Sequence, residues 1–164
     1  GELAEIMSHE HGKIIADSLG DIQRGVEMIE HSCNINTIYM GETLENISKN
    51  VDCYSYRHPL GVCAGVCAFN FPAMIPLWMF PVAIACGNTF IMKPSERVAT
   101  CTQIIGECLL EAGIPKGVVN IVHGGPQTVN NILDAPEIRA ISYVGSNQAG
   151  TYIYEKGSKN GKRV

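Results

Sequence analysis

The run Val62-Cys63-Ala64-Gly65-Val66-Cys67-Ala68-Phe69 carries no charge and is followed at once by Asn70, Phe71 and Pro72. An apolar run of this length, ended by a polar residue, is typical of a strand that is buried on both faces of a sheet. Proline suits the first position of a helix, where its missing N–H costs nothing. We therefore expect a buried strand at 62–69, with Asn70 at its carboxyl end and Pro72 at the start of the next helix.

The sequence after this run repeats the order of strand and helix. Ser95 is expected to cap the helix that follows it, with Glu96 in the first turn, and Gly113 is expected to end that helix. Strands separated by ~10–20 residues of helix form right-handed crossover units and a parallel sheet. The sequence therefore predicts an α/β fold with helices flanking the sheet. Further strands are expected at 89–92, 118–122 and 140–144, and helices at 75–85, 98–112, 128–133 and 148–156.

Residues 1–50, which precede the sheet, are expected to be mainly helical. Ile22, Val26, Ile29 and Cys33 recur at the spacing of one helix face. The polar stretch 41–52 is predicted to be a loop. The weak alternation at 51–58, closed by Pro59, indicates an edge strand or an arm.

The composition describes one globular unit. The chain has 164 residues, of which 46% are hydrophobic and 17% charged, and a formal net charge of −4. This balance excludes a disordered or coiled-coil chain and disfavours nucleic acid and anionic membranes as partners. The stretch 59–92 has no charged residue and is long enough to cross a bilayer. Its asparagines and prolines favour a strand, a turn and a buried helix instead.

Seven cysteines are an odd number, and no two of them have C-x-x-C spacing. We expect buried free thiols in a reducing compartment, and no zinc site. Trp78 and Met79 are expected in the core. The histidines at 9, 11 and 31 are expected to be exposed, and no Ser/His/Asp or Cys/His arrangement follows from the spacing.

Three segments at the expected strand ends are candidates for chemistry. The Asn70 amide suits an oxyanion, but an asparagine here also suits a helix cap. Lys93 and Glu96 could hold the hydroxyls of a ribose, which favours NAD over NADP, or the glutamate could simply complement a helix dipole. Gly145 and Ser146 could bind phosphate at a helix start, or form an ordinary turn. From the residues alone, these alternatives stay open.

Motifs in this sequence, taken together, resemble the aldehyde dehydrogenase family. They are Phe69-Asn70-Phe71-Pro72, Cys86-Gly87-Asn88-Thr89, Lys93-Pro94-Ser95-Glu96 and Val144-Gly145-Ser146. Phe69 stands where the family usually has tryptophan. This substitution narrows the resemblance to the CoA-acylating branch for methylmalonate and malonate semialdehydes. The same branch is indicated by Arg97, Tyr54-Ser55-Tyr56-Arg57 and the run 74–81. The resemblance covers the whole chain. It implies a Rossmann-like NAD-binding domain at 61–164, which is incomplete, an amino-terminal helical segment at 1–50, and an arm of the oligomerisation region at 51–60.

The resemblance also implies roles for individual residues. Asn70 matches the oxyanion-hole position, and Ser146 matches a position near the pyrophosphate. Lys93, Glu96 and Arg97 match positions on the adenosine side of the cofactor. Cys67 and Phe69 match backbone contacts beside the nicotinamide path, although relatives commonly have alanine and proline where this chain has Cys67 and Ala68.

As a function, the resemblance implies oxidation of a semialdehyde with NAD, transfer of the acyl group to CoA, and loss of CO₂ to give propionyl-CoA or acetyl-CoA. It implies a homotetramer in the mitochondrial matrix, or otherwise in the cytoplasm. The partners are the small-molecule semialdehyde and CoA, with no nucleic acid or membrane. None of the seven cysteines matches the family's nucleophile, so we expect an inactive fragment. The alternatives are a non-catalytic nucleotide-binding or interaction module, and a relative that uses water as acyl acceptor.

Overall fold

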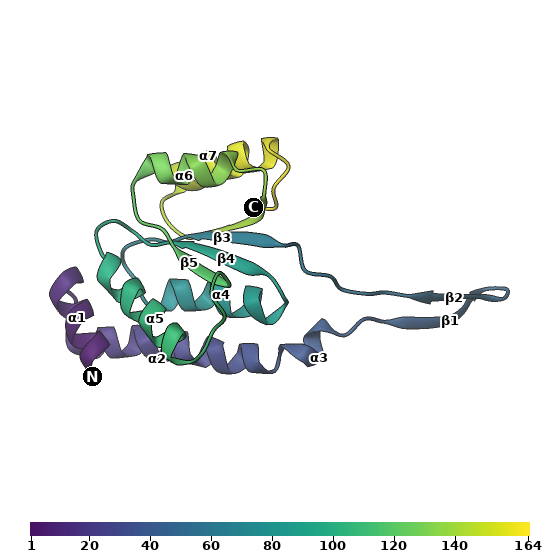
Figure 1. Cartoon of the computed structure of the whole chain (residues 1–164), viewed down its shortest axis with the longest axis horizontal. Helices are drawn as coiled ribbons and strands as arrows, with labels where there is room; N and C mark the ends of the chain where they lie inside the picture. The colour runs from purple at the N-terminus through teal and green to yellow at the C-terminus, as the bar shows by residue number, and fades with distance from the viewer.

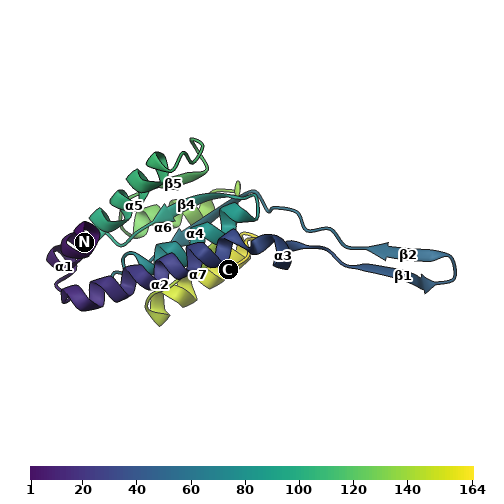
Figure 2. The same ribbon diagram turned by 90° about the horizontal axis from the view of Figure 1, so that it is seen from below.

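The computed structural model describes residues 1–164, in which a four-stranded sheet lies between layers of helices. Helices α6 and α7 cover one face of the sheet, α4 and α5 cover the other, and α2 packs beneath α4 (Figure 1). A two-stranded hairpin extends from one end of the body (Figure 2). The elements in chain order are α1 (Glu2–His11), α2 (Ile15–Cys33), α3 (Ile35–Tyr39), β1 (Thr43–Ser48), β2 (Val51–Tyr54), β3 (Val62–Val66), α4 (Met74–Ala85), β4 (Thr89–Lys93), α5 (Ala99–Glu111), β5 (Val119–Ile121), α6 (Pro126–Asp134), β6 (Ile138–Tyr143) and α7 (Asn147–Lys159).

The four strands of the sheet are parallel and have the order β5-β4-β3-β6. This confirms the predicted α/β fold with helices flanking a parallel sheet. The central strand β3 pairs with both β4 and β6, and its last residue, Val66, lies opposite Lys93 and Tyr143. Because the strands are parallel, the polypeptide leaves all of them at the same rim.

The two faces of the sheet have separate hydrophobic cores. On the face covered by α4 and α5, Phe90 and Met92 of β4 are almost fully buried together with Ile75 of α4. On the face covered by α6 and α7, Val66 and Leu133 pack in a second cluster. Burial of one such side chain contributes about 1.5–3 kcal/mol, so these two clusters hold the helix layers on the sheet.

The borders of several elements differ from the expected ones. Strand β3 ends at Val66 and α4 begins at Met74, so Pro72 lies in the turn before the helix and not at its first position. Helix α5 begins at Ala99, with no side-chain cap, and the prediction that Ser95 caps it is wrong. The Ser95 hydroxyl instead accepts a hydrogen bond from the backbone N–H of Arg97. The segment after Lys93 forms a turn before the helix begins. The preference of serine for helix N-caps does not predict this turn.

Helix α2 is present as expected, but its apolar stripe is only partly buried, with Ile22 packed against the core. Val26 and Ile29 are each 38% exposed. A side-chain Cβ on Gly25 would lie 2.4 Å from Cδ1 of Leu77, which shows how closely α2 approaches α4. Small and polar residues permit this approach where larger apolar ones would not. The buried residues of α2 are Ser18, Asp21, Gly25 and Ser32.

The predicted loop at 41–52 is wrong, because much of it forms a hairpin. Strand β1 pairs antiparallel with β2, and every residue in both strands is exposed. With neither face buried, the sequence carries no alternation of apolar and polar residues that would mark the first strand. An isolated hairpin is marginally stable in water, so this one is suited to packing against another surface.

Three further expectations are corrected by the structure. Trp78 is 45% exposed, although Met79 next to it is buried. The two ring nitrogens of His11 are buried rather than exposed to solvent. All seven cysteines are free, but they are not all buried. Cys33, Cys53 and Cys108 are exposed, Cys86 is half-buried, and Cys63, Cys67 and Cys101 are buried.

Beyond β6, the chain returns to the sheet at its last residues. Arg163 forms a parallel bridge with Ala140, and its carbonyl accepts a hydrogen bond from the N–H of Ile141 at 2.8 Å. The ammonium group of Lys162 donates to the carbonyl of Ile138 at 2.8 Å.

None of the helices is both long and apolar enough to cross a membrane.

Candidate functional site

The three candidate segments lie on one rim of the sheet. Asn70 follows β3, the Lys93–Glu96 segment follows β4, and Ser146 follows β6. Backbone hydrogen bonds join these strand ends directly, since the N–H of Cys67 donates to the Lys93 carbonyl at 3.0 Å and the N–H of Val144 donates to the Val66 carbonyl at 3.2 Å. Ligands of open α/β sheets bind along this carboxyl rim.

Lys93 and Glu96 form an ion pair at the end of β4. The Lys93 ammonium lies 3.1 Å from Oε2 of Glu96, with 5% of the lysine side chain exposed against 57% of the glutamate. A hydrogen bond from its own backbone N–H, and a second from Lys93, lower the pKa of the Glu96 carboxyl. Glu96 is therefore an ionised and accessible acceptor at neutral pH, held by a buried cation.

Ser146 is the N-cap of α7. Its hydroxyl accepts a hydrogen bond from the backbone N–H of Ala149 at 3.4 Å. The hydroxyl of Tyr143 donates to the Ser146 carbonyl at 3.0 Å, and a Cβ at Gly145 would lie 2.2 Å from that hydroxyl oxygen. A side chain at position 145 would therefore force the Tyr143 ring, which packs against this turn, to shift. A helix start with a serine cap is a favourable place for an anion.

A cavity of about 210 Å³ lies between these two segments. Lys93 and Glu96 form one side of it, and residues from the start of α6 and the first two turns of α7 form the other. Gly125 and Pro126, at the start of α6, also line it, and neither has a polar side chain that would mark it in the sequence. The lining residues are Val66, Lys93, Glu96, Gly125, Pro126, Val129, Tyr143, Ala149, Tyr152 and Ile153.

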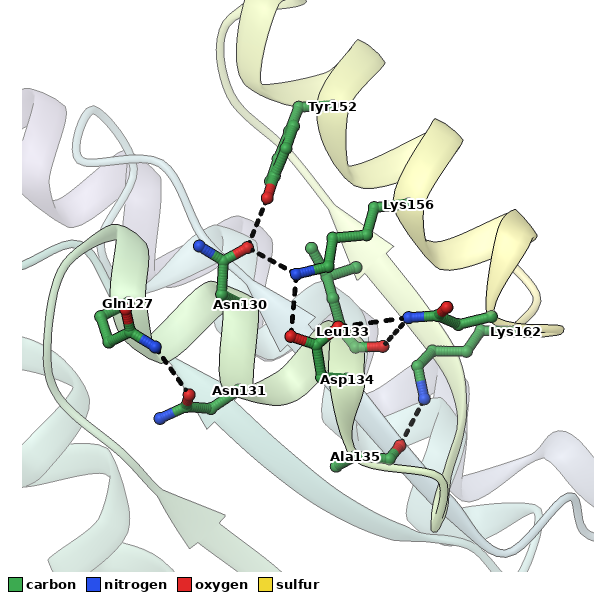
Figure 3. Close-up of polar contacts among 10 residues, drawn as sticks. Gln127, Asn130, Asn131, Leu133, Asp134, Ala135, Tyr152, Lys156 and Lys162 are labelled. Atoms are coloured by element: carbon green, nitrogen blue, oxygen red, sulfur yellow. Dashed lines mark hydrogen bonds and ion pairs between the residues drawn. The ribbon is translucent and has the colours of Figure 1, made fainter.

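A polar network joins the two helices that border this cavity (Figure 3). The hydroxyl of Tyr152 donates to the side-chain oxygen of Asn130, which also accepts from the Lys156 ammonium at 2.9 Å. Lys156 forms an ion pair with Asp134 at 2.8 Å. The hydrogen bonds from Lys156 and Asn160 lower the pKa of the Asp134 carboxyl. The network thus fixes α7 against α6 and keeps the cavity walls in place.

Asn70 lies in the exposed turn between β3 and α4. The N-cap of α4 is Ala73, and no side chain caps it, so the alternative in which Asn70 is a helix cap does not hold. Beside it, the ring of Phe69 stacks on His11 with 5.6 Å between the ring centres, and the Arg97 guanidinium lies 5.5 Å from the Phe69 ring centre. Arg97, which follows β4 in the sequence, therefore contacts Phe69, which follows β3.

A second cavity, of about 460 Å³, opens beside Asn70. It lies between the Asn70 turn and α2, and it contains the cations Lys13 and Arg24 and the acids Asp17 and Asp21. The sequence reading did not single out Arg24, because its place beside Asn70 depends on how α2 packs against α4. The lining residues are His11, Lys13, Ala16, Asp17, Gly20, Asp21, Arg24, Asn70 and Phe71.

The thiol of Cys67 is close to the rim but is not available for chemistry. Its sulfur lies 3.3 Å from the sulfur of Met92 and 3.9 Å from that of Met79, inside the core. Burial raises its pKa to about 12. At the rim, only the backbone groups of Cys67 can therefore contact a ligand. No group of three His, Cys, Asp or Glu side chains is placed to hold a metal ion.

A parallel sheet whose strand ends carry these polar segments places the protein in the open α/β class. The model of the Aldehyde dehydrogenase family matches residues 1–164. The chain belongs to the aldehyde dehydrogenase family.

Individual relatives are named for one particular activity within this family. The methylmalonate-semialdehyde/malonate-semialdehyde dehydrogenase [acylating], mitochondrial, of Rattus norvegicus is 56% identical over 163 residues, which are 99% of this chain and 30% of the relative. A Dictyostelium discoideum protein named for the same activity is 60% identical over 163 residues, 99% of this chain and 31% of its own length. This chain therefore spans about a third of the relatives it matches.

Solved structures agree with this relationship. A structure assigned to methylmalonate-semialdehyde dehydrogenase from Sinorhizobium meliloti, complexed with NAD, is 48% identical with a TM-score of 0.96, covering 99% of this chain and 33% of that one. The methylmalonate-semialdehyde dehydrogenase of Oceanimonas doudoroffii is 45% identical with a TM-score of 0.96 and the same coverage.

Proposed function

We propose that this chain is the cofactor-side part of an NAD-dependent, CoA-acylating dehydrogenase of methylmalonate and malonate semialdehydes. The observation that carries the proposal is the shared rim, where the strand ends bring Asn70, the Lys93–Glu96 pair and Ser146 together. The names of the relatives, and the NAD complex of the Sinorhizobium meliloti structure, support it.

The rim has the groups that a dinucleotide requires. In the proposal, the cavity beside α6 and α7 takes the adenine, and Glu96, held by the buried Lys93, accepts from the ribose hydroxyls while Arg97 supplies positive charge. The start of α7 with Ser146 faces the pyrophosphate. The backbone of Cys67 and Phe69 lines the path to the nicotinamide. When bound, NAD supplies the acceptor for a hydride.

Asn70 is proposed as the oxyanion donor. Its neutral amide does not titrate, so it can donate to a negatively charged oxygen across a wide pH range. The adjoining cavity contains the Arg24 guanidinium, which suits the carboxylate that distinguishes these semialdehydes from simple alkyl aldehydes. Because Lys13 in the same cavity is already paired with Asp21, the proposal assigns the carboxylate of the semialdehyde acid to Arg24.

The nucleophilic thiolate of the family is not among the cysteines of this chain. Of the seven, Cys67 lies at the end of β3, and its buried thiol remains protonated at neutral pH. In the proposal, a downstream part of the full-length enzyme supplies the nucleophile and CoA takes the acyl group, so this chain alone is inactive. A non-catalytic nucleotide-binding module is the alternative, and the protonated, buried state of the Cys67 thiol beside the rim is compatible with it.

The proposed organisation follows the fold. Within residues 1–50, the helices α1 to α3 pack on the cofactor domain, while β1 joins residues 51–60 in the oligomerisation arm because it pairs with β2, and residues 61–164 form the NAD-binding domain. The exposed apolar side chains of the β1–β2 hairpin, among them Leu44 and Ile47, suit a homo-oligomer in which another subunit covers them. The mitochondrial names of the relatives support a mitochondrial location.

A chimera tests this function. In it, the present chain replaces the 163 matching residues of the Rattus norvegicus relative. With methylmalonate semialdehyde, NAD and CoA, the chimera should form NADH and propionyl-CoA, whereas the present chain alone should form neither. NADH formation that does not depend on CoA would instead assign water as the acyl acceptor. A folded chimera without turnover would contradict the proposal.

A further inference from the structure

A buried ion pair links the amino-terminal helices to the turn that carries Asn70. The ammonium of Lys13 lies 2.9 Å from Oδ2 of Asp21, and the two side chains are 9% and 0% exposed. Lys13 lies between α1 and α2, and Asp21 is within α2. Charged side chains are rarely buried to this extent unless they are paired and hydrogen-bonded.

Both members of the pair also bind the turn after β3. Lys13 donates a second hydrogen bond, at 2.7 Å, to the backbone carbonyl of Asn70, and its ammonium lies 4.7 Å from the ring centre of Phe71. Oδ1 of Asp21 accepts a hydrogen bond from the backbone N–H of Met74 at 2.6 Å. The pair therefore holds both ends of the segment 70–74, which lies outside any strand or regular helix until Met74.

The contacts of this pair differ from those of an ordinary core residue. A buried pair of opposite charges is an inefficient way to stabilise a fold, because the desolvation of both ions offsets their attraction. This pair directs its remaining hydrogen bonds to the two ends of one segment, the exposed Asn70 and the buried Met74. An oxyanion donor, in contrast, depends strongly on such fixation, because it is effective only when it is already oriented before charge develops.

We propose that Lys13 and Asp21 are positioning residues that hold the backbone of Asn70 so that its amide is preoriented toward the oxyanion. The inference rests on the proposed function of Asn70. It assigns a role in the reaction to the amino-terminal helical segment, which otherwise contributes only packing. Neither residue takes part in the chemistry directly.

Loss of the pair should act through Asn70 and not on cofactor binding. In the chimera defined above, Lys13→Met should lower the rate of first-turnover NADH formation by about 10- to 100-fold, as expected when a donor is displaced by about 1 Å. The affinity for NAD should change by less than about twofold, since Lys93, Glu96 and Ser146 are untouched. Lys116→Met, in the exposed loop before β5, is the control and should leave the rate unchanged.

A double-mutant cycle separates positioning from a purely structural role. In an Asn70→Ala background, Lys13→Met should cost less than about twofold, because the group that it positions is already absent. An equal loss with and without the Asn70 amide would overturn the inference. Lys13→Met combined with Asp21→Asn removes both charges together, so that misfolding caused by one unpaired buried charge does not decide the result.

Amide hydrogen exchange gives a readout that does not require turnover. Exchange in the segment 69–74 should increase severalfold in Lys13→Met, while the segment 89–93 of β4 keeps its protection. Unchanged exchange at 69–74 would overturn the inference whatever the activity. If the unsubstituted chimera forms no NADH, the proposed function fails, and the exchange result alone decides whether Lys13 fixes the turn.

Discussion

Lys93 and Glu96 form a 3.1 Å ion pair in which the cation is buried and the carboxylate faces solvent. The pair therefore presents a negative charge at the rim of the sheet while its positive partner stays inside. A free ribose 2′-hydroxyl can donate to such a carboxylate, whereas a 2′-phosphate is repelled by it. This asymmetry is the basis of the expected preference for NAD.

Substitution of Glu96 should weaken that preference. In the chimera, Glu96→Gln should lower the ratio of the NAD and NADP affinities by about tenfold, equivalent to ~1.4 kcal/mol, because the repulsion of the phosphate is lost. Fluorescence titration with both cofactors measures the ratio. Glu111→Gln, an exposed glutamate at the end of α5, is the matched control. An unchanged ratio in Glu96→Gln would remove the ribose role.

The preference should persist into mildly acidic solution. The pKa of Glu96 is lowered from the usual 4.5 by hydrogen bonds from its own backbone N–H and from Lys93. The carboxylate therefore stays mostly ionised in mildly acidic solution, and the preference is lost as the pH falls through the lowered pKa. Cofactor titrations from neutral pH downward should show a decline in the ratio that is centred below pH 4.5. A decline that is centred above pH 4.5 would contradict the assigned cause.

The close contact of α2 and α4 should make Gly25 intolerant of a side chain. A Cβ there would lie 2.4 Å from Cδ1 and 3.0 Å from Cβ of Leu77, so Gly25→Ala should destabilise the chain by about 1–3 kcal/mol. Gly20 lies in the same helix, and no atom lies within 4 Å of the place that its Cβ would occupy, so Gly20→Ala should stabilise by about 0.5–1 kcal/mol. Thermal melts followed by circular dichroism compare the two variants. Equal shifts in Tm would show that the contact is unimportant.

The cysteines should react in two groups. At pH 8 in the native chain, iodoacetamide should label the exposed Cys33, Cys53 and Cys108 first. Cys67 and Cys101 should react only after unfolding, since burial raises the pKa of each thiol to about 12 and blocks access to it. Mass spectrometry of labelled peptides measures the order. Labelling of Cys67 as fast as Cys53 would contradict the packed position of its sulfur.

The parallel sheet and its order of strands and helices could be predicted because they are buried. The charge-free run around Val66 and the helical periods after it carry clear patterns. The first strand of the hairpin, β1, was missed because all of its residues are exposed, so no alternation marks it, whereas β2 falls within the edge strand or arm expected at 51–58. The buried face of α2 was missed for the opposite reason. Its buried residues are small or polar. The Asp21 carboxylate accepts a hydrogen bond from the backbone N–H of Met74, which is 53 residues away in the sequence.

In the candidate site too, some features follow from the sequence pattern and others arise only from the packing of helices. The positions of Asn70, Lys93 and Ser146 at strand ends follow from the pattern of the sequence, and the structure places these ends side by side. Their roles stay predictions. Arg24 and Tyr152 could not be found in this way, because each reaches its cavity through the packing of one helix on another.

The most direct test of the shared rim is amide hydrogen exchange of the chimera with and without saturating NAD. One dinucleotide bound along the rim should protect the segments 66–70, 93–97 and 145–149 together, while the hairpin at 43–54 remains unaffected. Protection of only one of these segments, or of none at saturation, would contradict the central claim that the three strand ends form a single cofactor site.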